Sequence, residues 1–191
     1  PARLDPFQAT GADMTATRTL HLIPVGLGES AISCWLPEDV KTQATGLTTY
    51  NAENSKTARA FLKLVGTHAA LQDITIHTLT VKSRVADIAA WLDALPPDGH
   101  IGLVSEAGCP AVADPGAQVV AIAHDMDIKV QPWVGPSSIL LGLMGSGLSG
   151  QRFAFHGYAP IDSPERAKTL QSWELHSGRH RQTQMLIETP Y

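Results

Sequence analysis

The chain has 191 residues, of which 43% are hydrophobic and 17% charged, and this composition is typical of an ordinary globular protein with one domain or two small ones. Its 14 basic and 18 acidic side chains give a formal charge of −4, without the basic excess that is typical of an RNA-binding surface. The chain has no apolar run of about 18 residues, which argues against a membrane span. Its two cysteines, Cys34 and Cys109, lack metal-type spacing and indicate a reduced, cytoplasmic protein.

The first half of the chain predicts strands that alternate with helices. Residues 1–18 have no continuous apolar core like that of a signal peptide, and we expect them to be an appended or disordered segment. Five strands are then expected, at Thr19–Val25, Thr48–Glu53, Ile74–Thr80, His100–Ser105 and Ile128–Val134. The expected helices are Lys56–Val65 with Ser55 as its cap, a segment with the apolar stripe Val85, Ile88, Ala89, Leu92 and Leu95, and Ala117–Met126. This alternation predicts an α/β domain over residues 19–134, with a mostly parallel sheet covered on both faces.

The pattern changes at the turn Gly135–Ser137. A glycine-rich helix is expected at Ser138–Leu148, and because glycine weakens helices, we expect this helix to pack closely against a neighbour. The remaining elements expected are a strand at Arg152–Tyr158, a helix that Ser163 caps, with Pro164 and Glu165 in its first turn, and a strand at Gln184–Glu188. One such unit is too small to fold alone. We therefore expect residues 135–191 to begin a second α/β domain that is truncated here or completed by another subunit.

The residues best suited to bind a ligand are concentrated at positions 102–116, with the sequence GLVSEAGCPAVADPG. An apolar strand ends there in a loop, and such loops hold ligands in α/β proteins. Gly108 and Gly116 can adopt positive φ, while Pro110 and Pro115 stiffen the loop. The segment therefore predicts a ligand site.

Carboxylates in and near this loop are candidates for acid–base chemistry. Glu106 and Asp114 are the candidate catalytic bases, because burial can raise the pKa of a carboxyl group toward the range where it accepts a proton. Asp114 could instead cap the helix that follows it. Glu53, at a strand end, either lines the cleft or forms an ion pair with Lys56 or Arg59.

The histidines and cysteines give weaker signals. His176 and His180 are four residues apart, but Gly178 lies between them in a polar segment that resembles a turn, and no third ligand is near. We therefore predict no metal site. Cys109 has no obvious histidine partner and is predicted to fill space rather than to act as a nucleophile.

Six short motifs follow one another in a fixed order. They are LIPVGLGE at 22–29, AENSK at 52–56, SEAGCPAVADPG at 105–116, VGPS at 134–137, FHGYAP at 155–160 and ETPY at 188–191. They resemble VVPTPIGNL, AEDTR, SDAGTPxISDPG, PGPSA, FxGFLP and ESPHR of the tetrapyrrole methylase family, the class III S-adenosylmethionine (SAM) methyltransferases. Within that family the chain is most similar to the branch that 2′-O-methylates a cytidine of small-subunit ribosomal RNA. It departs from the motifs at Gly26, Asn54, Lys56, Glu106, Cys109, Ala113 and Val134.

The resemblance implies two α/β domains with SAM in the cleft between them. It implies an in-line methyl transfer that requires accurate positioning and no metal. The cofactor contacts it implies are Pro24, Gly26, Gly28, Ser105, Glu106, Ala107, Gly108, Ala113, Gly135 and Pro136. The partners it implies are ribosomal RNA or the small ribosomal subunit as substrate, and a second copy of the chain in a homodimer.

Three alternatives stay open on the sequence. The first keeps the fold and methylates a carbon of a tetrapyrrole, such as a corrin or porphyrin precursor. The second is an NAD-dependent oxidoreductase that uses the Gly26 and Gly28 turn, with Glu53 ending the second strand. The third is an inactive SAM-binding module, suggested by the departures at Glu106 and Cys109, among others.

Overall fold

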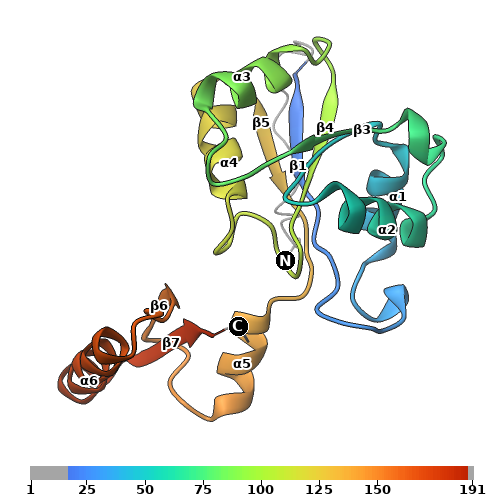
Figure 1. The fold of residues 1–191 in the computed structure, drawn as a ribbon. Helices are drawn as coiled ribbons and strands as arrows, with labels where there is room; N and C mark the ends of the chain where they lie inside the picture. Colours follow the sequence, from blue (N-terminus) through green and yellow to red (C-terminus); the bar gives the residue numbers. More distant parts are fainter. Residues whose placement is uncertain (1–16, 189–191) are drawn as a thin grey trace, which may run out of the picture.

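A computed structural model describes residues 17–188 of the chain. Its largest sheet has five parallel strands in the order β3-β2-β4-β1-β5 (Figure 1). The strands are β1 (Thr19–Leu22), β2 (Thr49–Ala52), β3 (Thr75–Thr78), β4 (His100–Val104) and β5 (Lys129–Pro132). The predicted α/β class and parallel sheet are confirmed.

Helices cover both faces of this sheet, as expected (Figure 1). They are α1 (Glu38–Gly46) and α2 (Ser55–Val65) on one face, and α3 (Val85–Asp93) and α4 (Gly116–Asp125) on the other. Neighbouring residues of a strand point to opposite faces, so each strand contributes to two separate cores. In β1, for example, Leu20 packs under α3 and α4, whereas Ile23, just beyond the strand, packs with α1 and α2.

The boundaries of several elements differ from the predictions. The first strand ends at Leu22 rather than Val25, because Pro24 has no N–H to continue the ladder. Asn54, not Ser55, caps α2, and its side chain accepts a hydrogen bond from the N–H of Lys56 at 2.9 Å. α1 and two short 3-10 helices, at Ile32–Cys34 and Leu71–Asp73, were not predicted.

The central strands are locked together by an aromatic side chain. Tyr50 of β2 fills the space beside Gly102 of β4, where an added Cβ would lie 2.3 Å from the Tyr50 ring. The Tyr50 hydroxyl donates a hydrogen bond to the carbonyl oxygen of Ala44 at 2.7 Å. This side chain therefore packs across the β2–β4 pair and links β2 to α1.

The rest of the described chain lies beyond the carboxyl ends of the five strands (Figure 1). It contains α5 (Ser138–Ser146), β6 (Phe153–Tyr158), α6 (Ser163–His180) and β7 (Thr183–Ile187). β6 and β7 pair in parallel to form a second sheet. Asp162, rather than the predicted Ser163, caps α6 by accepting a hydrogen bond from the N–H of Glu165 at 3.0 Å.

The turn expected around Gly178 is wrong. Gly178 lies inside α6, because one glycine costs a long helix only about 1 kcal/mol. His176 and His180 therefore lie on one face of that helix, with their rings tilted by 31° and their centroids 4.2 Å apart. No group of three metal-ligating side chains occurs among the described residues.

The glycine-rich helix α5 does not pack closely within the described part of the chain. Leu143 is its one buried residue, and Leu140, Leu141 and Met144 are exposed. An added Cβ at Gly145 would meet no atom within 4 Å. The expectation of close packing is therefore wrong for residues 17–188, because no described segment covers this face.

None of the described helices combines the length and apolarity needed to cross a bilayer.

Candidate functional site

The strand order creates a switch point between the neighbouring strands β1 and β4. From β1 the chain crosses to β2 on one side, whereas from β4 it crosses to β5 on the other. In open α/β sheets, ligands bind outside the carboxyl ends of the strands at such a point. The loops that follow β1 and β4, residues 23–31 and 105–115, begin there.

These two loops are joined by backbone hydrogen bonds. The N–H of Val25 donates to the carbonyl oxygen of Gly108 at 3.0 Å, and the N–H of Gly108 donates to that of Val25 at 3.2 Å. Gly108 has φ +73°, and an added Cβ would lie 3.2 Å from both Leu27 Cδ2 and the Pro136 carbonyl oxygen. Glycine is therefore required where the loops after β1, β4 and β5 meet.

The loop after β5 is held against the other two. An added Cβ on Gly135 would lie 2.1 Å from Pro24 Cγ, so these two residues are in close contact. The Cys109 thiol donates a hydrogen bond to the carbonyl oxygen of Pro136 at 3.3 Å. Backbone and small side chains thus fix all three loops at one edge of the sheet.

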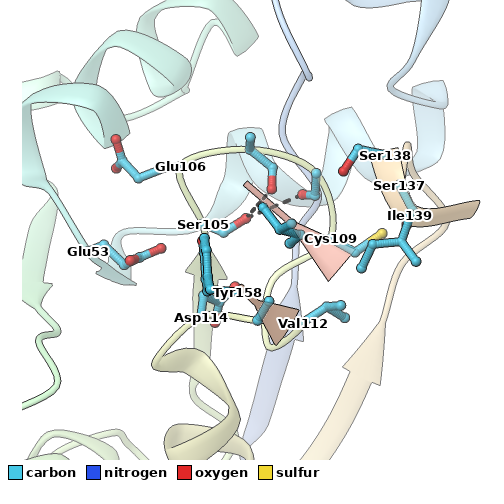
Figure 2. A pocket seen from close by; sticks show the side chains of 14 residues that line it. Glu53, Ser105, Glu106, Cys109, Val112, Asp114, Ser137, Ser138, Ile139 and Tyr158 are labelled. Atoms are coloured by element: carbon cyan, nitrogen blue, oxygen red, sulfur yellow. Dashed lines mark hydrogen bonds between the residues drawn. The ribbon is translucent and has the colours of Figure 1, made fainter. Parts of the chain in front are cut away.

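A cavity of about 330 Å³ opens at this edge, within the size range of small-molecule sites (Figure 2). Its walls come from both sheets: Glu53, Ser105, Glu106, Ala107, Gly108, Cys109, Val112, Ala113, Asp114, Ser137, Ser138, Ile139, Tyr158 and Ile187. Figure 2 shows Glu53 and Glu106 on one side of the loop after β4, and Cys109, Ser138 and Ile139 on the other. We call this the acidic cavity.

Two further cavities adjoin the acidic cavity. One, of about 760 Å³, shares Ser137 with it and is mostly apolar, with Trp35, Leu140, Leu141 and Met144 in its wall. We call it the apolar cavity. The other, of about 410 Å³, shares Glu106 and Ala107 with the acidic cavity. Together they form a continuous set of hollows around the three loops.

The structure brings almost all the cofactor residues predicted from sequence to these hollows. Ser105, Glu106, Ala107, Gly108 and Ala113 line the acidic cavity, Gly28, Gly135 and Pro136 the apolar cavity, and Gly26 the third. Pro24 lines none of the three and packs against Gly135 instead.

Sequence reasoning missed the residues that reach the cavities from distant elements. Ser138 and Ile139 begin α5, Tyr158 ends β6 and Ile187 ends β7, and no local pattern marks them. Trp35 was also missed, although it lines two hollows. Its Nε1 is buried and has no hydrogen-bond partner among the described residues, so a ligand there would find a donor.

Three carboxylates line the acidic cavity, and its wall contains no Lys, Arg or His within the described chain. Glu106 accepts a 2.6 Å hydrogen bond from the Thr57 hydroxyl of α2. Asp114 Oδ1 accepts bonds from the N–H groups of Ala111 at 3.0 Å and Gly116 at 2.7 Å, and so also helps to start α4. Its Oδ2 is buried and has no hydrogen-bond partner in residues 17–188.

Burial perturbs two of these carboxyl groups. It raises the pKa of Asp114, although N–H groups of its own loop act in the opposite direction. Burial also raises the pKa of Glu53, and the negative charges of Asp114 and Glu106 raise it further. The predicted alternative of an ion pair is wrong, since neither Lys56 nor Arg59 pairs with Glu53 in the described structure.

The Cys109 thiol belongs to the same wall. Burial raises its pKa, which keeps the sulfur protonated and a poor nucleophile near neutral pH. Its hydrogen bond to the carbonyl oxygen of Pro136 helps to hold the loop after β4 against the loop after β5. This environment fits the predicted space-filling role.

No family model matches the chain. The chain is similar to curated proteins named ribosomal RNA small subunit methyltransferase I. The one from Mycobacterium tuberculosis is 33% identical over 103 residues, which are 54% of this chain and 35% of the relative's length. That from Neisseria meningitidis serogroup A is 33% identical over 124 residues, 64% of this chain and 40% of its own. That from Streptococcus pyogenes is 27% identical over 188 residues, 96% of this chain and 60% of its own.

The chain therefore spans 35% to 60% of the length of these relatives. The relatives confirm the family resemblance that the six motifs indicate, and the chain is homologous to these methyltransferases.

Proposed function

We propose that this protein uses SAM to methylate a ribose 2′-hydroxyl of small-subunit ribosomal RNA. The observation that carries the proposal is the acidic cavity at the β1/β4 switch point, formed by the loops whose sequences resemble the methylase motifs. The relatives' names, which refer to ribosomal RNA, favour RNA over a tetrapyrrole as substrate, and favour methyl transfer over nicotinamide chemistry.

The charge and shape of the cavities fit SAM. The cofactor carries a positive sulfonium and a positive amino group, and the acidic cavity offers carboxylates without a competing cation among the described residues of its wall. The buried Asp114 Oδ2 has no partner in residues 17–188, and an unpaired buried acceptor is costly unless a ligand donor or water satisfies it. Trp35 and Leu140 of the apolar cavity would suit the adenine ring.

When bound, the cofactor would supply an electrophilic methyl group. Nine of the ten residues predicted from sequence, all except Pro24, line the cavities and would hold it, mostly through the backbone of the three joined loops. Because the Val25–Gly108 pair fixes two of these loops, the site is formed before the ligand arrives, which lowers the entropic cost of alignment. Tyr158 and Ile187 would cover the acidic cavity from the second sheet.

The homodimer is also a proposal, and the exposed apolar residues of α5 support it. Leu140, Leu141 and Met144 form an exposed apolar face that continues from the wall of the apolar cavity. Such patches on soluble proteins mark contact surfaces. A second copy of the chain is the partner we propose for this face.

Two measurements test the proposed activity. Calorimetric titration of the protein with S-adenosylhomocysteine should show binding, and titration with NADH should not; the reverse pattern would refute the proposal. The protein should then transfer labelled methyl groups from SAM to small ribosomal subunits that lack the modification. Label that enters tetrapyrrole precursors but never RNA would refute the RNA substrate.

A further inference from the structure

Methylation of a hydroxyl requires a group that accepts its proton. We infer that the side chain of Glu53, at the carboxyl end of β2, is this proton acceptor, with Asp114 as its electrostatic support. The inference rests on the proposed function, because it concerns the same cavity and the same reaction.

The other groups of the cavity wall that could exchange a proton have competing roles. The Cys109 thiol donates to Pro136, and burial keeps it protonated. Glu106 accepts the short hydrogen bond from Thr57 and lies on the α2 side of the cavity (Figure 2). Asp114 uses Oδ1 to hold two backbone N–H groups of its own loop. Glu53 makes no side-chain-to-side-chain hydrogen bond among residues 17–188, and the backbone N–H of Glu106 favours its carboxylate form.

The environment of Glu53 suits a general base. Its side chain is half-buried at the sheet edge, directly after β2 and beside the loop that follows β4. Burial and the charges of Asp114 and Glu106 raise the pKa of Glu53 against the opposing effect of the Glu106 backbone N–H, which strengthens its carboxylate as a proton acceptor. Raised carboxyl pKa values in a cavity are typical of catalytic groups.

An unpartnered polar atom in the cavity wall is an independent sign of a polar ligand. Asp114 lines the same cavity as Glu53, and its Oδ2 is buried without a hydrogen-bond partner in the described chain. Buried water or a donor group of a ligand is required to satisfy such an atom.

The proton balance of the step is simple. The hydroxyl oxygen forms a bond to the methyl carbon while the methyl–sulfur bond breaks, and that electron pair stays on the sulfur. The hydroxyl proton passes to a Glu53 carboxylate oxygen and then to solvent at the mouth of the cavity. The sulfonium loses its positive charge, the Glu53 carboxylate is regenerated, and one proton is released for each methyl group transferred.

The test compares Glu53→Gln, Glu53→Asp and the control Glu174→Gln, which changes an exposed carboxylate on α6, in the intact protein. We expect Glu53→Gln to lower kcat by about 10²- to 10⁴-fold, the usual contribution of a general base, with the S-adenosylhomocysteine Kd unchanged. Glu53→Asp should restore part of the rate, and Glu174→Gln should behave as wild type. Circular dichroism spectra of the variants check their folding.

A second readout does not depend on activity. Carbon-13 NMR of the labelled glutamate carboxyl groups should show one signal, absent in Glu53→Gln, that titrates above the ordinary range and moves to lower pH in Asp114→Asn. An active wild type with a fully active Glu53→Gln variant would overturn this inference alone. Loss of S-adenosylhomocysteine binding by Glu53→Gln would make Glu53 a binding residue and would also overturn it. A wild type that neither binds S-adenosylhomocysteine nor transfers methyl groups would overturn the proposed function itself.

Discussion

Gly135 and Pro24 are in such close contact that a methyl group on Gly135 would lie 2.1 Å from Pro24 Cγ. Pro24 belongs to the loop after β1, and Gly135 belongs to the loop after β5 and lines the apolar cavity. A larger residue at either position would therefore push the loop after β1 away from the loop after β5 and change the width of the apolar cavity.

The substitution Gly135→Ala should displace the loop after β5 and weaken ligand binding. We expect the Kd for S-adenosylhomocysteine to rise about tenfold, since small displacements of a binding loop are costly. Calorimetry measures this change. The matched control is Gly145→Ala in α5, where no atom lies within 4 Å of the added carbon. It should bind normally and gain about 0.5–1 kcal/mol of stability, because alanine favours the helix. Equal affinity in both variants would contradict the prediction.

The acidic cavity predicts that SAM binding depends on pH. Burial raises the pKa of Asp114, so this group loses its negative charge at a higher pH than an ordinary carboxyl group. As pH falls through this raised value, the cavity loses part of its attraction for a cation, and the Kd for SAM should rise. Calorimetry between pH 5 and 8 checks this, with Asp114→Asn expected to flatten the profile. An unchanged Kd over this range would contradict it.

Buried His21 of β1 predicts loss of stability in acid. Trp133 Nε1 donates a hydrogen bond to its Nδ1 at 3.1 Å, and its Nε2 lies 3.0 Å from His100 Nδ1. Burial, followed by the charges of His100 and Lys129, lowers the pKa of His21 from 6.5 to about 4.

As the pH falls, the unfolded chain therefore binds a proton at His21 at a higher pH than the folded chain does. The free energy of unfolding should be fully retained above pH 6.5 and should fall as the pH decreases toward about 4. Urea titrations across this range measure the loss. Trp133→Phe removes the donor that opposes protonation, so it should lower stability at pH 7 but reduce the dependence on pH. A wild-type stability that is flat from pH 7 to 4 would refute this account.

The apolar face of α5 predicts a dimer that one charge can disrupt. Met144 is 78% exposed and lies with Leu140 and Leu141 on this face. Met144→Lys should shift the protein from dimer to monomer in light scattering, because burial of an unpaired charge in an interface is costly. Lys168→Met on exposed α6 is a control that should leave the dimer intact. A monomeric wild type would contradict the proposed dimer.

Long periodic patterns made most of the fold predictable from the sequence. The five strands and the helices α2, α3 and α4 each carry apolar residues at strand or helix spacing, and the structure places them within a few residues of the predictions. α1 was missed because only Val40, Ala44 and Thr45 of its nine residues are buried, which leaves too little apolar periodicity to detect. The caps of α2 and α6 were each placed one residue late, because a serine follows Asn54 and Asp162 and is itself a favourable cap.

The site was predictable only where one loop carries it. The segment 105–114 supplies most of the acidic cavity, and its glycine, its proline and its two acidic residues are visible in the sequence. Tyr158 and Ile187 come from strands far along the chain, and their approach depends on tertiary packing that no local pattern encodes. The sequence places Glu53 at a strand end, where it either lines the cleft or forms an ion pair, but its position in one cavity with Asp114 and Glu106 follows from the pairing of β2 with β4.

The paired hydrogen bonds between Val25 and Gly108 use backbone atoms alone. The backbone framework of the cavity is thus independent of most side chains in the loops. The position of a ligand depends on this framework, whereas its chemistry depends on the side chains. Side chains such as Glu106 and Ala113 can be exchanged, by drift or by design, while the loops stay joined. A protein built in this way can change its ligand specificity while it keeps its loop framework.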